Sequence, residues 1–398
     1  MIRTAICVLC LSTVPVMATD VAALALKGNQ AAIDELSQIA APTDEDRMAL
    51  GMFHFLRGVE RALQVRYDMN ISPEYMNLPL MRLPLPDNPN AKPFAATAIT
   101  NFTSGLIDEM QAARAALDGT PETSSVQLTV QINDLWFDLN ADGKRDANTD
   151  VGLADFAADM VRGGFVPDDQ AGNLPAVKFD VADRSWLIAY THMLEGFGNL
   201  VLTYDPAKAI DEVFATRTKL AELNEGLSMG NAMDMQFGSF IDGFAAVQAA
   251  LDQEPDVDRA KQAREHLLAM VQANRDFWRL VKLETDNDAE WIPNDNQTAA
   301  LGFQLPKDTG VVWMSVLEDG EKLLNGELLI PYWRLGTGAG LNMKKMFENP
   351  PAVDLMGWVQ GRAAMPYAER GERVSAQNWW RFEQMMSGQG MIFAFLMN

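Results

Sequence analysis

The chain has 398 residues, of which 54 are acidic and 32 are basic, and its formal net charge is −22. Such an excess of negative charge repels phosphate backbones and anionic lipid heads, which argues against nucleic-acid binding and against peripheral membrane binding. A chain of this length exceeds the size of one simple core, so we expect either two lobes or one large helical body.

The first 18 residues have the pattern of a signal peptide. Arg3 supplies a positive charge, residues 5–14 are apolar, and a Val-Met-Ala sequence at the end suits cleavage. Both cysteines of the chain, Cys7 and Cys10, lie within this segment, so the mature chain would have no disulfide and no cysteine-ligated metal. We therefore expect a periplasmic or extracellular protein. No stretch reaches the roughly 18–20 apolar residues of a membrane span.

Apolar residues recur at intervals of three and four over most of the mature chain, the spacing typical of amphipathic helices. Met48, Met52 and Phe55 show this spacing within 44–67, and Thr43 can cap the first turn. The predicted helices cover 21–39, 44–67, 94–117, 153–162, 186–202, a segment from about 206, 230–251, 257–282, 309–324, 343–348, 352–360 and 375–386. Two segments, 73–93 with its six prolines and 327–333, are predicted to be extended. We expect 19–398 to form a single, mainly α-helical unit.

The segment at about 122–180 differs from the helical remainder. Apolar and polar residues alternate strictly over 126–133, which predicts a strand with one buried face. Residues 176–180 form a second extended stretch. We expect the two stretches to pair as a small β-ribbon, with the acidic loop between them at one end.

This acidic loop has the residue types and the spacing of a calcium-binding loop. Calcium takes six to eight oxygen ligands, and a tight loop supplies them from alternate residues around a glycine, here Gly143, at the sharp turn. The predicted ligands are five side chains and one main-chain carbonyl, that of the lysine: Asp138, Asn140, Asp142, Lys144, Asp146 and Asp150. The sequence therefore predicts an EF-hand-like loop that holds a structural calcium ion.

Two features of the loop leave alternatives open. Thr149 occupies position 12, where an EF-hand has a bidentate glutamate, so either Asp150 or Asp155 would complete the calcium shell. A strand rather than a helix leads into the loop, as in the EF-hand-like loops of dockerins and related extracellular calcium modules. The other interpretation is an Asp/Asn/Gly turn in which the side chains hydrogen-bond their own backbone.

Several segments together resemble a family of uncharacterised, secreted, mostly helical bacterial proteins with an EF-hand-like calcium loop. The matching segments are 83–89, 138–146, 180–187 with Tyr190 and His192, 290–294, 331–334 and 364–367. The resemblance extends over nearly the whole mature chain, and it implies one unit rather than two separable domains. It implies no particular reaction.

His192 and Glu195 stand three residues apart on a predicted helix, so both side chains can face the same side. The form His-x-x-Glu resembles the core of the Gly-x-His-x-x-Glu motif of imelysin-like periplasmic proteins, with Tyr190 in place of the glycine. A catalytic interpretation makes His192 a general base oriented by Glu195, with Asp183 as a further candidate. The other interpretation is a core histidine that hydrogen-bonds its neighbour.

Two functions from different classes follow from these features. The first is an exported, calcium-stabilised helical scaffold that binds a small ligand or a protein partner. The alternative is a metal-dependent or carboxylate-dependent hydrolase with its site around His192 and Glu195. A pocket that holds His192 beside two carboxylates would favour the hydrolase.

Overall fold

The computed structural model describes residues 19–71, 85–156, 174–225, 238, 241, 248–249, 252–352 and 354–397. The predicted signal peptide, most of the predicted helix 230–251 and the first part of the proline-rich segment lie outside these residues. The described chain is mainly helical with small antiparallel sheets, so the predicted fold class is confirmed at this level.

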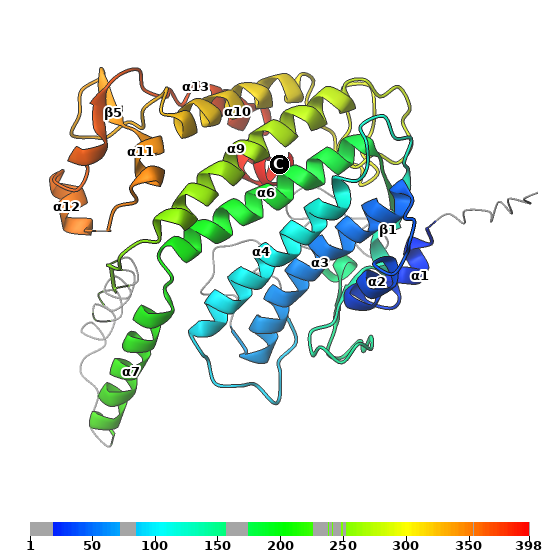
Figure 1. The fold of residues 1–398 in the computed structure, drawn as a ribbon, viewed down its shortest axis with the longest axis horizontal. Helices are drawn as coiled ribbons and strands as arrows, with labels where there is room; N and C mark the ends of the chain where they lie inside the picture. The colour runs from blue at the N-terminus through cyan, green and yellow to red at the C-terminus, as the bar shows by residue number, and fades with distance from the viewer. Residues whose placement is uncertain are drawn as a thin grey trace, which may run out of the picture.

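Four long helices lie side by side and form the body of the molecule (Figure 1). They are α3 (Asp44–Asp68), α4 (Thr97–Leu117), α6 (Val181–Thr203) and α9 (Val257–Val281). Helix α7 (Ala207–Leu223) continues from α6 and projects beyond the body. The helices α3 and α4 approach closely because Gly51 has no side chain, and a Cβ there would lie 2.6 Å from Cγ of Leu117.

Short helices and strands surround this body. At the N-terminal end, α1 (Val21–Ala25) and α2 (Asn29–Leu36) replace the single predicted helix 21–39. They separate at Gly28, which has a φ of +88° and packs against Trp136. The C-terminal elements are α10 (Thr309–Asn325), β5 (Ala339–Leu341), α11 (Met343–Glu348), α12 (Leu355–Gln360), β6 (Ala368–Arg370), α13 (Gln377–Met385) and α14 (Gly390–Met397). Helix α14 was not predicted from the sequence.

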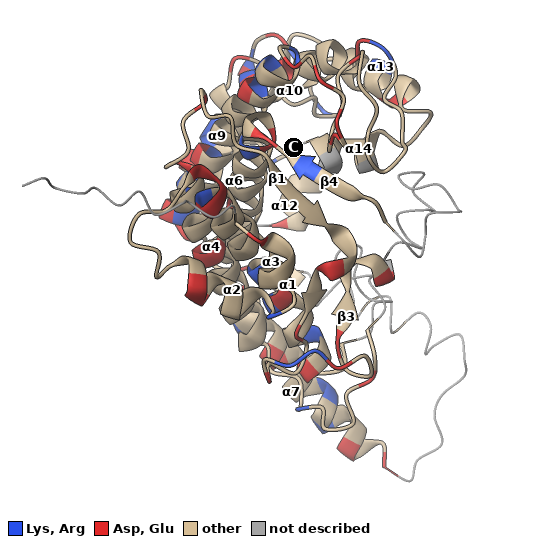
Figure 2. Cartoon of the chain, turned by 90° about the vertical axis from the view of Figure 1, so that its right-hand side faces the viewer, with Lys and Arg blue, Asp and Glu red and all other residues tan. Residues whose placement is uncertain are grey.

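The predicted β-ribbon is present. Strand β1 (Leu128–Gln131) pairs antiparallel with β4 (Ala176–Phe179), and Val130 lies opposite Val177 with both side chains buried. The strands lie beside the helical layer in the side view (Figure 2). Glu290 extends the pairing through bridges to Lys178 and Ala299, so the segment after α9 packs along this ribbon.

The position of the acidic loop differs from the prediction. The turn of 3-10 helix at Ile132–Asp134 ends the first strand early, and a second antiparallel pair follows, β2 (Trp136–Phe137) with β3 (Val151–Gly152). The loop 138–150 connects β2 to β3, so the predicted attachment to the β1–β4 ribbon is wrong. Of the predicted helix 153–162, residues Leu153–Phe156 form one turn of 3-10 helix, and the remainder lies outside the described residues.

One large hydrophobic cluster joins α1, α2, α3 and α6 to the strands, and Phe53, Phe137 and Val177 are among its buried members. A second cluster lies between α9, α10, α13 and α14, and a third lies around β5 and the segment that follows α12. In the described part of the chain, no helix combines the length and the apolar character that crossing a membrane would require.

Candidate functional site

The first half of the loop 138–150 is a series of tight turns held by its own side chains. The Asp138 carboxylate accepts hydrogen bonds from the backbone N–H groups of Asp142 at 3.2 Å and Gly143 at 2.8 Å. Asn140 accepts from the N–H of Asp142 at 3.1 Å, and Asp142 accepts from that of Lys144 at 2.8 Å. Gly143 has a φ of +72°, the left-handed conformation that the sharp turn requires.

Asp150 connects the two ends of the loop. One of its carboxylate oxygens accepts from the N–H of Leu139 at 3.0 Å and the other from that of Asp146 at 2.7 Å. The residue is only 8% exposed, and this burial, together with the charges of Asp138 and Asp142, raises the pKa of its carboxyl group.

Asp155, the other candidate for completing a calcium shell, accepts from the N–H of Gly152 at 2.5 Å. It follows β3 and is thus outside the loop. Of the two candidates, the structure therefore places Asp150 with the other predicted ligands.

Helix α3 holds the start of the loop through two side chains. The Glu60 carboxylate accepts from the N–H of Asp138 at 2.9 Å, and the amide of Gln64 donates to the carbonyl of Asp138 at 2.6 Å. Leu139 follows with its side chain in the main core. The backbone N–H and the carbonyl of Asp138, the first predicted calcium ligand, are therefore both held by side chains of α3.

Glu60 is itself buried, at 1% exposed, and burial raises the pKa of its carboxyl group. Arg57 lies 2.6 Å from one Glu60 oxygen, and Asn29 donates to the other at 2.8 Å. Glu60 thus joins α2, α3 and the loop, an arrangement that the sequence analysis missed. Its signal in the sequence is a single carboxylate on the apolar face of 44–67.

Among the residues that the structure describes, no three His, Cys, Asp or Glu side chains are arranged as a group that could hold a metal ion. The predicted calcium shell does not consist of such side chains alone, because it also includes the side-chain oxygen of Asn140 and the main-chain carbonyl of Lys144. The hydrogen bonds within the loop fit both of the interpretations made from the sequence. They position oxygens around the turn, and they also satisfy the backbone in the way an Asp/Asn/Gly turn does.

A second group of polar residues lies between α4, α6 and α9. His192 and Glu195 are on one face of α6, as predicted, and His266 of α9 lies close to both. The two histidine Nδ1 atoms are 3.0 Å apart, and His266 Nε2 lies 3.2 Å from Glu195 Oε2. Arg114 of α4 pairs with the other oxygen of Glu195, which is fully buried.

The two histidines share one hydrogen bond between their Nδ1 atoms, so one ring donates and the other accepts. His266 Nε2 lies within ion-pair distance of Glu195 Oε2, but this buried oxygen accepts no hydrogen bond within the described chain. Burial and the charge of Arg114 lower the pKa of His192 to about 3, which keeps this ring neutral at neutral pH.

Asp183 is not part of this group. It lies in the first turn of α6, where it forms a capping box with Asp180. Asp183 and His192 are nine positions apart, which corresponds to about 13 Å along a helix. Asp183 instead lies near three other carboxylates. Burial raises its pKa most, and the charges of Asp180, Glu284 and Glu290 raise it further. Burial and neighbouring carboxylates likewise raise the pKa of Glu284 to about 8.

The remaining histidine, His54, also pairs with a buried carboxylate. Its Nδ1 lies 2.7 Å from one oxygen of Glu109 on α4, and Arg61 lies 2.8 Å from the other. Each histidine of the described chain therefore belongs to an Arg–Glu–His group at a helix–helix interface. His266 and Arg114, the two partners missed from the sequence, join the site only through the packing of α4, α6 and α9.

Comparison of the chain with protein-family models, with curated proteins and with solved structures gives no match. The resemblance to secreted helical bacterial proteins therefore stays a prediction from the sequence.

Proposed function

We propose that this is an exported, soluble helical protein in which a structural calcium ion occupies the loop 138–150, and that it acts by binding a ligand or a protein partner. The observation that carries the proposal is the preorganised first half of the loop. The oxygens of Asp138, Asn140 and Asp142 are held at alternate positions around Gly143. This is the order in which EF-hand-like loops supply ligands to calcium, with Asp146 and Asp150 contributed by the second half.

Two further features support a structural role for the ion. Glu60 and Gln64 fix the backbone of Asp138 to α3, so the loop is attached to the main helical body. Burial, and then repulsion from Asp138 and Asp142, raises the pKa of Asp150, and a divalent cation would relieve the repulsion. The apolar segment 5–14 and the acidic composition support export.

The test is thermal unfolding of the mature chain with calcium and with a chelator. A ligand that binds only the folded state stabilises it by about 2.7 kcal/mol at a free concentration of 100 times its Kd, so calcium should raise the midpoint by several degrees. The informative variant is Asp142→Asn. Asparagine retains the oxygen that accepts from Lys144 but removes the charge.

If the loop is only a turn, this variant and the wild type unfold alike in both conditions. If it binds calcium, the variant loses most of the calcium-dependent shift. Glu254→Gln, at an exposed acid outside the loop, is the control and should retain the full shift. An unchanged wild-type midpoint on chelation would refute the calcium proposal.

A second candidate function is hydrolysis with His192 as the base, since the structure brings His266 to the predicted pair of His192 and Glu195. The pKa of about 3 makes His192 a weak base at neutral pH, which counts against this role. The test is hydrolysis of a panel of ester, glycoside and phosphoester substrates. A hydrolase should lose its activity in His192→Gln, and absence of turnover by the wild type on all three classes would reject this candidate.

A further inference from the structure

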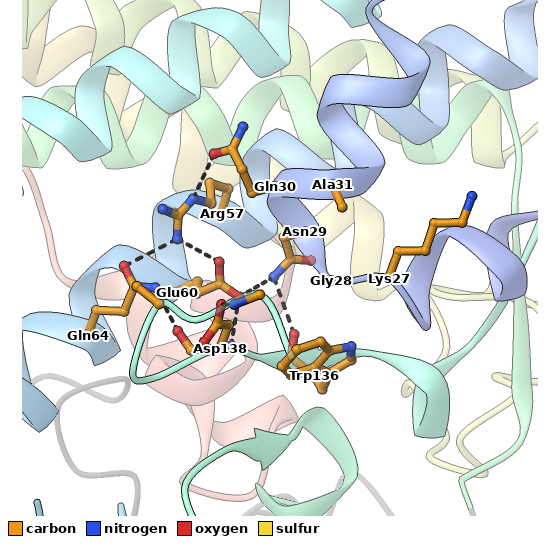
Figure 3. Close-up of a pocket in the computed structure, with 12 residues that line it drawn as sticks. Lys27, Gly28, Asn29, Gln30, Ala31, Arg57, Glu60, Gln64, Trp136 and Asp138 are labelled. Atoms are coloured by element: carbon orange, nitrogen blue, oxygen red, sulfur yellow. Dashed lines mark hydrogen bonds and ion pairs between the residues drawn. The ribbon is translucent and has the colours of Figure 1, made fainter. Parts of the chain in front are cut away.

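A pocket of about 190 Å³ lies beside the start of the loop, between the N-terminal end of α2, one face of α3 and residues 138–143 (Figure 3). Since a water molecule has a share of about 30 Å³ of liquid volume, the pocket has room for roughly six waters or one ligand of similar size. Its lining contains three amide side chains, Asn29, Gln30 and Gln64, together with the almost fully buried Trp136.

The charged groups around the pocket neutralise one another. Arg57 pairs with Glu60, and the ammonium group of Lys27 pairs with Glu35 at 2.5 Å. Figure 3 shows Lys27 extending away from the Arg57 and Glu60 pair. The remaining charge is that of Asp138, which the proposed calcium ion would neutralise. The pocket therefore offers a charged ligand no net attraction.

The hydrogen-bonding groups of the pocket are of both kinds. Gln64 accepts from Arg57 and donates to the Asp138 carbonyl, and Gln30 accepts from Arg57 and donates to Asp34. Each of these amides has two N–H hydrogens and two lone pairs, so these contacts leave one of each available. The first N–H groups of α2 are further donors, because the N-cap residue Gly28 has no side chain to satisfy them.

Trp136 offers a ligand almost no surface, because it is only 2% exposed and its indole N–H donates to the carbonyl of Ala25 at 2.9 Å. A ligand that fits must therefore both donate and accept hydrogen bonds and carry no net charge. Hydroxyl groups on a small carbon skeleton meet both conditions.

We propose that this pocket binds one small, uncharged, hydroxyl-rich molecule of monosaccharide size. The proposal deepens the proposed function, since it names the ligand class of the scaffold and rests on calcium to neutralise Asp138. The pocket and the calcium loop share Asp138, Ala141 and Gly143 in one wall. Because Glu60 and Gln64 already hold the backbone of Asp138, calcium affects ligand binding through the charge of Asp138.

The experiment is calorimetric titration of the mature, calcium-loaded chain with D-glucose, D-galactose, D-mannose and myo-inositol. Methyl glycosides of the three sugars test whether the ligand is a free sugar or the end of a glycan. Glucuronate and glucosamine provide a negative and a positive counterpart of similar shape. We expect at least one neutral compound to bind at least tenfold more tightly than both charged counterparts, and calcium removal to weaken it at least tenfold.

Two matched variants locate the binding. Ala31 is exposed and lines the pocket, so Ala31→Trp places a large ring at its entrance without changing the core. Ala23, on α1, is also exposed and is absent from the pocket lining, so Ala23→Trp is the control. We expect the first variant to weaken ligand binding at least tenfold with an unchanged unfolding midpoint, and the second to bind like the wild type.

The outcomes separate this proposal from the calcium proposal. A chain that calcium stabilises but that binds none of the neutral compounds refutes the pocket and leaves the calcium loop standing. Binding that Ala31→Trp abolishes, in a chain that calcium does not stabilise, supports the pocket and refutes the calcium loop. Tighter binding of glucuronate than of every neutral compound would show that the α2 N-terminus and Arg57 recognise an anion, and the proposal would be wrong.

Discussion

Raising the pH is expected to destabilise the protein through the buried carboxylates at the start of α6. The perturbation that isolates this effect is Glu284→Gln. In the folded chain Glu284 lies near Asp180, and its pKa is raised from 4.5 to about 8, mainly by burial and then by the charge of Asp180. Asp183 and Glu290 have raised pKa values for the same reasons.

The sign follows from proton binding. A carboxyl group with a raised pKa in the folded state holds its proton there at a pH at which the unfolded chain has released it. The free energy of unfolding therefore falls as the pH rises from about 4.5 to about 8, and the stabilising contribution is lost above that range. One pKa unit corresponds to about 1.4 kcal/mol, but Glu284 is only partly buried and solvent screens its interactions, so we expect a loss of about 1–2 kcal/mol.

The assay is urea unfolding of the wild type and Glu284→Gln at a series of pH values between 5 and about 9. Glutamine retains an acceptor for the amide of Gln297, which donates to Glu284 at 3.1 Å, but it does not ionise. The free energy of unfolding of the variant, relative to that of the wild type, should therefore increase by about 1–2 kcal/mol as the pH rises across this range. Glu254→Gln, at an exposed acid, serves as the control. Parallel stability curves for the wild type and Glu284→Gln would refute the reasoning.

Two further predictions concern the contacts between helices. Glu195→Ala removes the acid from a buried Arg–Glu–His group and leaves Arg114 unpaired, so it should cost about 3–5 kcal/mol in the free energy of unfolding, measured by urea titration. Equal stability would show that the group contributes nothing to helix packing. Gly51→Ala places a Cβ 2.6 Å from Leu117, so overpacking should cost about 1–3 kcal/mol. Gly320→Ala on α10 is the matched control, because a Cβ at that position would have no neighbouring atom within 4 Å. It should stabilise the protein by up to about 1 kcal/mol, which is the difference in helix propensity between glycine and alanine. The same sign for both glycine variants would contradict the argument from packing.

Local signals in the sequence predicted the helices well because caps and apolar spacing are properties of neighbouring residues. Thr43 caps α3 through a capping box with Asp46, as its position predicted. The prediction started α6 at 186, whereas the capping box of Asp180 and Asp183 starts it at Val181. Gly28 divided the predicted helix 21–39 because Trp136, far away in sequence, packs against it.

The candidate sites were predictable only in part. The spacing from Asp138 to Asp146 identified the loop, since its turns depend on contacts between residues two to five apart. Its attachment was not predictable, because Glu60 and Gln64 reach it across more than 70 positions. Likewise, His192 and Glu195 share a helix face by their spacing, but His266 contacts them only through the packing of α9 on α6.

The attachment of the loop to α3 also determines what calcium can do there. Asp150 joins the loop's two ends, and Glu60 holds the N–H of Asp138, so the loop backbone is ordered by the protein alone. An ion that enters such a site has little backbone to rearrange, and its binding free energy adds to the stability of the folded state. Conformational switching requires two backbone states with different affinities for the ion. We therefore expect calcium to shift the unfolding midpoint while leaving the far-ultraviolet circular dichroism of the folded chain unchanged, and a calcium-dependent change in that spectrum would indicate a switch instead.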